Sequence, residues 1–412
     1  MLLCFAATTA AAVTPPPDPD PQVPSLDAIL RGHPGLAPLL EDAEALRLQV
    51  LLGTLEEGSG GPRLVQQGFR ADAEYTYPAS TIKLCAAVAA LQELERLRRK
   101  TGLAVDADTP LVFHPLFDDE VLERHDPDNR SGQRITVRQE IRELFLVSDN
   151  TAFNRLYELV GPAALNRSMH RAGLPSTHIV HRLSEARSPE EQLRLPRIDL
   201  AGDGFVHTLP RRVDPPPPTA KAVPGLRVGR GYLTHGASGP RRVDGPMDFA
   251  TKNRMSLRDL QRALAMVVRP DLGALGGPGF GLTDDQGALL LEPMYQLPRE
   301  SKNPVYDPTE YTDQWVKFLL PGLERVLPKS RLRIYNKIGR AYGFSTENAY
   351  VVDTETGRGF FLAATIYTNR DGILNDDRYE YEQVADPFFA DLGEAVARAL
   401  WPDRFLQTDA PR

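Results

Sequence analysis

Strand-like segments lie at both ends of this chain, and helical segments fill the middle. The strand-like runs occupy residues 48–55, 63–69, 332–339, 349–357 and 359–368. The first two flank a glycine-rich turn at Gly58–Gly61, which predicts a β-hairpin. Because the two groups of strands are separated by about 260 residues of mostly helical sequence, the economical arrangement is one antiparallel sheet built from both chain ends. The order predicts an α+β fold with an all-helical lobe inserted into the sheet lobe.

Helices are expected where apolar residues recur every three or four positions. These segments are residues 80–99, 137–147, 149–159, 162–172, 256–268 and 386–401. The last is amphipathic and begins with Asp386 as the expected N-cap and Pro387 at the first helical position. We expect this terminal helix to cover one face of the sheet.

The expected organisation is one catalytic domain over residues 25–402. Its sheet lobe spans about residues 40–75 and 330–402, and its helical lobe about residues 76–329. Residues 186–250 are rich in Pro, Gly and Arg without a sustained period, so we expect a long loop or insertion there, with the Pro-rich part at about 195–250. Pro215–Pro218 predicts a short polyproline segment. Residues 403–412 are expected to be a tail.

The charge and cysteine content exclude several classes of protein. The 412 residues carry a net charge of −7, which argues against a nucleic-acid or anionic-membrane partner. Two cysteines, Cys4 and Cys85, are too few for a disulfide framework, and Cys85 is expected to be a small core residue. No run reaches the roughly 18 apolar residues of a membrane helix. We therefore expect no integral membrane segment, and a monomer.

The first 24 residues leave two interpretations open. "MLLCFAATTAAAVTPPPDPDPQVP" has a short apolar stretch and a small-residue site at Ala10–Ala12, but it lacks a basic n-region. The segment is either the remnant of an export signal or a disordered, Pro-rich tail. The first interpretation predicts a periplasmic or secreted protein.

Ser80 and Lys83, in "STIK", begin the first long helical run. Residues three apart share one helix face, so a neutral lysine could accept the serine proton. The exposed N–H groups of a helix start could stabilise an oxyanion. Taken alone, however, the pair is better explained as an N-cap serine and a surface lysine.

Two further segments carry similar ambiguity. Ser148-Asp149-Asn150 separates two helical stretches, where it could cap the second helix or supply a relay hydroxyl and a substrate-binding amide. Lys337 precedes Gly339 at the end of a strand, where a cation beside close-approaching backbone suits a carboxylate. The alternative explanation is an ordinary strand end.

Together, "STIK", "SDNTAFN" and "YNKIGRAYG" resemble the ordered S-x-x-K, S-D-N and K-[ST]-G motifs of class A β-lactamases and penicillin-binding proteins. The second match extends to Thr151, Ala152 and Asn154, and residues 161–173 resemble the helix that follows in class A enzymes. The resemblance covers roughly residues 40–402 and implies the two-lobed β-lactamase-like fold.

The resemblance also implies a role for each matched residue. It makes Ser80 the acylated nucleophile, Lys83 its base or proton relay, and Ser148 the donor to the leaving nitrogen. Asn150 and Lys337 would bind the substrate amide and carboxylate. The implied oxyanion site consists of the backbone N–H groups of Ser80 and of Arg340, the residue after Gly339. No metal or cofactor is implied.

The sequence departs from the family pattern at two places. Ile338 stands where the third motif has a hydroxyl, so one hydrogen bond to a carboxylate is missing. In the ungapped alignment Arg187 falls at the position of the glutamate that activates the deacylating water, and arginine cannot act as a base. The nearby carboxylates are Glu185, Glu190 and Glu191. Acylation is thus better supported than release of the acyl group.

The leading hypothesis is a serine acyl hydrolase acting on β-lactams or related amides and esters. The alternatives are a D-alanyl-D-alanine peptidase-like cell-wall enzyme with slow deacylation and a non-catalytic protein that binds cell-wall fragments. A metalloenzyme is weakly supported, because His178 and His181, with His125, Asp126 and Asp128, match no established ligand spacing.

Overall fold

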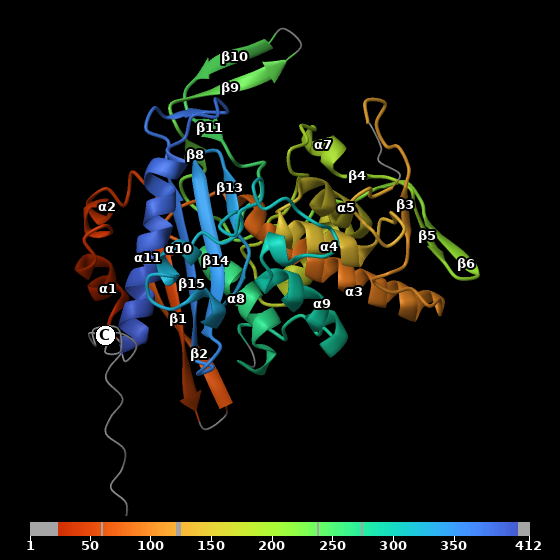
Figure 1. Cartoon of the computed structure of the whole chain (residues 1–412). Helices are drawn as coiled ribbons and strands as arrows, with labels where there is room; N and C mark the ends of the chain where they lie inside the picture. Colours follow the sequence, from red (N-terminus) through yellow and green to blue (C-terminus); the bar gives the residue numbers. More distant parts are fainter. Residues whose placement is uncertain (1–23, 59–60, 121–124, 237–238, 273–274, 403–412) are drawn as a thin grey trace, which may run out of the picture.

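The computed structural model describes residues 24–58, 61–120, 125–236, 239–272 and 275–402. A sheet lobe and a helical lobe lie side by side (Figure 1). The expected export-signal remnant and Cys4, together with the tail at 403–412, lie outside these residues. None of the described helices combines the length and apolar sequence needed to span a membrane.

The main sheet has six strands drawn from both chain ends. They are β1 (Gln49–Gly58), β2 (Gly61–Phe69), β12 (Leu332–Asn336), β13 (Gly339–Ala341), β14 (Phe344–Asp353) and β15 (Gly359–Tyr367). The order is β12-β14-β15-β1-β2, with β13 paired to the other end of β14, and every pair is antiparallel. The predicted α+β fold, with both chain ends in one antiparallel sheet, is therefore confirmed.

The two faces of the sheet follow the alternation of side chains along each strand. On β1, Leu52 packs into an apolar cluster with the terminal helix α11 (Asp386–Leu400), whereas Leu51 packs into the cluster of the helical lobe. Figure 1 shows α11 and the short α1 (Leu26–Gly32) and α2 (Ala37–Glu41) on one side of the strands. The opposite face is covered by α8 (Leu257–Val268). The sheet is thus buried on both faces.

The helical lobe agrees with the apolar periodicity of the sequence. Its helices are α3 (Lys83–Thr101), α4 (Val137–Leu146), α5 (Asn150–Val160), α6 (Pro162–Arg171) and α9 (Asp284–Tyr295), whereas α10 (Leu320–Leu323) packs against α11 in the sheet lobe. Helix α3 is the most central, with eleven buried residues. Cys85 on this helix is buried in the apolar core, and its sulfur lies 3.7 Å from that of Met255.

The expectation of a long loop at 186–250 is wrong for much of that segment. It contains a short helix and paired strands: α7 (Pro189–Gln192), β4 (Arg194–Leu195), β5 (Ile198–Gly202), β6 (Phe205–Leu209), β7 (Arg212–Val213), β8 (Arg227–Val228), β9 (Gly231–Gly236), β10 (Gly239–Asp244) and β11 (Met247–Asp248). Further strands outside it complete these small sheets, namely β3 (Leu111–Phe113) and β16 (Ile373–Leu374). Strands of two to six residues are too short to leave a period in the sequence. Pro215–Pro218 lies between strands.

The expected N-cap of the terminal helix is also wrong. Helix α11 continues directly from a π-helical turn at Tyr381–Ala385, so Asp386 is already its first residue. The Asp386 carboxylate instead pairs with Arg340. A side chain with a strong tertiary partner is not available to cap, which sequence alone does not reveal.

Candidate active site

Ser80 lies in a 3₁₀ turn, η1 (Ala79–Ile82), that leads directly into α3. The interpretation of Ser80 as a helix N-cap is wrong, because Ile82 precedes the helix and no side chain caps it. The preceding Ala79 has a φ of 45°, a left-handed conformation that costs a non-glycine residue about 1 kcal/mol. This tight turn leaves Ser80 half-buried on the lining of a cavity.

Lys83 is completely buried, so the alternative of a surface lysine is wrong as well. Its ammonium donates to the Ser148 carbonyl and, at 2.8 Å, to Asn150 Oδ1, while Ser148 Oγ lies 3.4 Å away. Burial lowers the pKa of Lys83 to about 7, an effect that the negative charge of Asp149 partly opposes. A large fraction of Lys83 is therefore neutral near pH 7, and neutral lysine is a proton acceptor.

The Ser148-Asp149-Asn150 turn caps a helix and also contacts the buried lysines. Asp149 caps α5, since its Oδ1 accepts the Ala152 N–H at 2.7 Å. Ser148 adopts a φ of 61°, and its hydroxyl faces the buried lysines. Asn150 bridges Lys83 to the rim of the cavity, because its Nδ2 donates to Ser184 Oγ at 2.8 Å.

Lys337 meets the same hydroxyl from the sheet side. Its Nζ donates to Ser148 Oγ at 2.8 Å and to the Ile338 carbonyl at 3.0 Å. Burial and the proximity of Lys83 hold the pKa of Lys337 well below its usual value. Two lysines thus flank one serine hydroxyl, an arrangement suited to passing a proton between them.

Gly339 allows β13 to run against the turn that holds Ser80. A Cβ at this position would lie 2.4 Å from the Pro78 carbonyl oxygen and 2.7 Å from the Ser80 nitrogen. Both neighbours are backbone atoms, so no other residue fits without moving a chain segment. The structure therefore brings the Ser80 N–H and the strand containing Arg340 into direct contact, as the predicted oxyanion site requires.

The side chains on either side of Gly339 are both committed elsewhere. Ile338 is buried in the apolar cluster beneath α11. The Arg340 guanidinium donates to Ser345 Oγ, pairs with Asp386 and lies 4.4 Å from the centre of the Phe318 ring. Arg340 lines the cavity, yet its charge already has a carboxylate partner.

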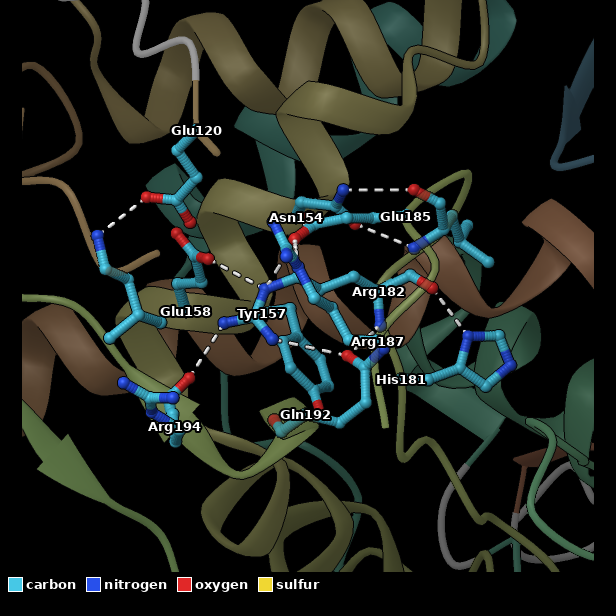
Figure 2. Close-up of polar contacts among 12 residues, drawn as sticks. Glu120, Asn154, Tyr157, Glu158, His181, Arg182, Glu185, Arg187, Gln192 and Arg194 are labelled. Atoms are coloured by element: carbon cyan, nitrogen blue, oxygen red, sulfur yellow. Dashed lines mark hydrogen bonds and ion pairs between the residues drawn. The ribbon is translucent and has the colours of Figure 1, made fainter. Parts of the chain in front are cut away.

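The loop after the helical lobe is anchored by the fully buried Arg182 (Figure 2). Arg182 Nε pairs with Glu158 at 2.8 Å, its Nη1 reaches the Gln192 side-chain oxygen at 3.2 Å, and its Nη2 reaches the Arg194 carbonyl at 2.8 Å. Asn154 clamps the next residue through two hydrogen bonds with the Leu183 backbone, at 3.0 and 2.8 Å. The side chains of Arg182 and Asn154 therefore hold the backbone of this loop in place.

The four charged residues considered for deacylation fall into two groups. Glu185 lines the Ser80 cavity, but its Oε1 lies 2.8 Å from Arg187 and its Oε2 3.8 Å from Arg182. Arg187 also pairs with Asp119 and lies over the Phe117 ring. Glu190 and Glu191 belong to α7, where the Glu191 side chain accepts the Ser188 N–H in a capping box. Among the described residues, none of these three glutamates places a carboxylate with two unpaired oxygens beside Ser80.

The cavity has a volume of about 580 Å³, within the range typical of small-molecule sites. Its lining contains residues that no motif indicated, including Tyr77, Lys252, Tyr342, Asp377, Tyr379 and Tyr381. Lys252 has no acidic partner in the described ranges, and its Nζ lies 5.7 Å from the centre of the Tyr342 ring. In the sequence, the only sign of these lining residues is the group of tyrosines near the chain end. That group does not indicate what the cavity binds.

The histidines and acids considered as metal ligands lie apart from one another or have other contacts. His178 pairs through its backbone with Arg254, and His181 stacks on Tyr77. Burial lowers the pKa of both histidines to about 4. His125 is exposed on the surface of the described chain.

Asp126 instead groups with two glutamates of α4. Asp126, Glu140 and Glu143 each offer a carboxylate oxygen within 4.8 Å of the others. Desolvation raises the pKa of Glu143 to about 10 and that of Glu140 to about 7. Glu143 therefore holds a proton at pH 7, and Glu140 pairs with Arg155 at 3.2 Å.

Part of this chain is similar to a known protein family. The Beta-lactamase2 model, described as the beta-lactamase enzyme family, matches residues 65–206. That range includes Ser80, Lys83, Ser148 and Asn150 but not Lys337. No curated protein matches the chain.

Solved structures similar to this chain include several β-lactamases. That from Desulfarculus baarsii DSM 2075 has 16% identity and a TM-score of 0.48, with 88% of this chain and 95% of that chain covered. L2 complexed with relebactam has 20% identity and a TM-score of 0.47, with coverage of 91% and 98%. The enzyme from Streptomyces albus G has 18% identity and a TM-score of 0.46, with coverage of 88% and 96%.

Proposed function

We propose that this chain, whose residues 65–206 match the model of the beta-lactamase enzyme family, is a serine acyl hydrolase that forms an acyl-enzyme at Ser80. The proposed substrates are β-lactams or related amides and esters. One observation carries the proposal: Ser148 Oγ lies between the ammonium groups of Lys83 and Lys337, beside a cavity lined by Ser80. A structural serine needs no such pair of buried lysines.

In the proposed acylation, neutral Lys83 accepts the Ser80 hydroxyl proton, directly or through a relay, as Ser80 Oγ bonds to the substrate carbonyl carbon. The developing oxyanion is held by the backbone N–H groups of Ser80 and Arg340. The carbon–nitrogen bond then breaks, and Ser148 gives its proton to the leaving nitrogen. Ser148 regains a proton from the lysine pair, which leaves an ester at Ser80 and a protonated leaving group.

Deacylation is proposed to be slow. Water attack on the ester needs a base, and Glu185 has each oxygen engaged by an arginine. This observation favours the second candidate, a D-alanyl-D-alanine peptidase-like enzyme, over an efficient lactamase. A non-catalytic protein that binds cell-wall fragments is less well supported, because burying two lysines without a function costs stability.

Lys252 is proposed to bind the substrate carboxylate. Of the cations lining the cavity, Arg182 pairs with Glu158 and Arg340 pairs with Asp386. Lys252 has no such partner in the described part of the chain, so its charge is available to an anionic substrate. This assignment compensates for the hydroxyl that Ile338 lacks.

Intact-mass spectrometry of the purified full chain with benzylpenicillin tests the proposal. We expect a mass increase of one penicillin, complete loss of the adduct in Ser80→Ala, and retention in Ser184→Ala. Ser184 is a matched control because it lies on the same cavity lining. No adduct with any β-lactam or activated ester, or an adduct that persists in Ser80→Ala, refutes acylation at Ser80.

Turnover separates the remaining candidates. Rapid nitrocefin hydrolysis supports a lactamase, whereas an adduct that outlasts removal of excess β-lactam supports the peptidase-like enzyme. Binding of peptidoglycan fragments without any adduct supports the non-catalytic protein. We further propose a monomer that acts in the periplasm or after secretion, where cell-wall substrates are found.

A further inference from the structure

A second cavity lies behind the active-site wall, with a volume of about 280 Å³. Its sides come from the connection after β2, the turn after α6, the insertion at residues 221–224 and the start of α8. The insertion is held in place by backbone hydrogen bonds from Tyr75 N–H to the Pro224 carbonyl, at 2.8 Å, and from Lys221 N–H to the Pro175 carbonyl, at 3.0 Å. The cavity is therefore a formed feature of the fold.

The acidic residues on this lining already have cationic partners. Asp72 pairs with Arg258 at 3.3 Å, and Glu74 pairs with Arg70 at 2.8 Å. Asp259 accepts two hydrogen bonds from Ser176, from its N–H at 2.8 Å and its hydroxyl at 2.5 Å, and lies 3.7 Å from Arg262. No lining carboxylate is left to balance a further positive charge.

Two lining cations, Arg254 and Lys221, have no acidic partner in the described ranges. Arg254 Nε is buried and makes no hydrogen bond. The backbone of Arg254 is fixed by a pair of hydrogen bonds with His178, at 2.8 and 2.9 Å, so the base of its side chain is held in position. A buried, unpaired guanidinium donor is costly unless a ligand completes it.

The cavity is separate from the substrate site. Lys252 lines the active-site cavity and Arg254 lines the rear one, on opposite sides of the fully buried Asn253. Asn253 Oδ1 accepts the Val180 N–H at 2.7 Å, and the Asn253 carbonyl accepts the Tyr75 hydroxyl at 3.1 Å. The Lys252 side chain therefore cannot readily reach the rear cavity, nor the Arg254 side chain the active-site cavity.

We propose that the rear cavity binds a small monocarboxylate with an apolar body. The carboxylate would be held by Arg254 and Lys221, which offer a forked guanidinium and an ammonium. The apolar part would contact Val223, Met255 and Leu257, which share the lining. The volume exceeds that of an inorganic ion, and the apolar side chains match an organic body. This inference does not depend on acylation at Ser80.

Ligand-observed NMR titration of the full chain tests it, with benzoate as the anionic probe and benzamide as its neutral counterpart. We expect benzoate to bind at least about ten-fold more tightly than benzamide, because only the carboxylate can form a charged hydrogen bond with the two cations. Arg254→Gln should weaken benzoate binding by about ten-fold or more and leave benzamide unchanged. Arg241→Gln, on the projecting β9–β10 hairpin (Figure 1), should change neither.

Lys252→Gln distinguishes the two cavities. Benzoate binding that is lost in Lys252→Gln and kept in Arg254→Gln belongs to the active site and overturns the proposal. Equal binding of benzoate and benzamide by the unsubstituted chain overturns it as well, without reference to any variant. The melting temperature of Arg254→Gln checks that the variant is folded, and Lys221→Gln repeats the test at an exposed position.

Discussion

The pH dependence of acylation provides the most direct test of the role of Lys83. With a pKa of about 7, Lys83 is neutral in about 9% of molecules at pH 6 and in about 91% at pH 8. Acylation that needs the neutral amine should therefore accelerate about ten-fold across this interval and level off above pH 8. A lysine with an ordinary pKa of 10.5 would be neutral in only about 0.3% of molecules at pH 8, and its rate would still be rising.

The assay is the single-turnover rate of adduct formation with excess benzylpenicillin, quenched and followed by intact mass between pH 5.5 and 9. Asp149→Asn supplies the matched perturbation. The Asp149 charge raises the pKa of Lys83, so its removal should move the half-maximal pH below 7. Asparagine still caps α5 adequately.

Two results would contradict this reasoning. A rate that is flat from pH 6 to pH 8 excludes a titrating base with a pKa near 7. A half-maximal pH that is identical in Asp149→Asn shows that the titrating group is not Lys83. Lys83→Gln should abolish acylation at every pH, because glutamine cannot accept the proton.

Three further predictions concern backbone approach, substrate charge and buried acids. Gly339→Ala should lower the acylation rate by about 100-fold or more, because its Cβ would lie 2.4 Å from the Pro78 carbonyl oxygen and 2.7 Å from the Ser80 nitrogen, and the measured rate at saturating penicillin checks this. Lys252→Gln should raise the penicillin concentration for half-maximal acylation about ten-fold with little change in maximal rate, as measured by the same assay. Glu143→Gln should stabilise the fold at pH 8, relative to its effect at pH 5, by up to about 4 kcal/mol, since the raised pKa of Glu143 makes stability fall as pH rises from about 4.5 toward about 10. Urea unfolding at pH 5 and pH 8 checks this last effect, which should be small at pH 5.

The elements that the sequence predicted well are those with long periodic patterns. The expected helix at 137–147 is α4 (Val137–Leu146), and the hairpin at 48–69 is β1 and β2. Each has enough residues for its buried face to recur in the sequence. The paired strands within residues 186–250 are two to six residues long and mostly half-exposed, so their sequence shows no regular recurrence of apolar residues.

The site was predictable in its motifs but not in its electrostatics. "STIK" and "SDN" indicated which residues meet, yet "STIK" taken alone favoured a surface lysine at position 83, where the structure buries it completely. Burial depends on α5 and β13 closing over α3, which is a tertiary property. The sequence did not indicate Lys252, because this residue belongs to no motif. It became a candidate only when the structure showed that Arg182 and Arg340 already pair with carboxylates.

The contacts of Arg187 prevent a single substitution at that position from supplying a deacylation base. Arg187 lies 4.0 Å from the centre of the Phe117 ring and pairs with Asp119 and Glu185, and it lines a different cavity from Ser80. A glutamate at this position would lose all three contacts and face two carboxylates instead. The loop backbone, meanwhile, is fixed by the buried Arg182–Glu158 pair. Faster deacylation would thus require a rebuilt loop, whereas the proposed acylation uses groups held by α3, α5 and the sheet.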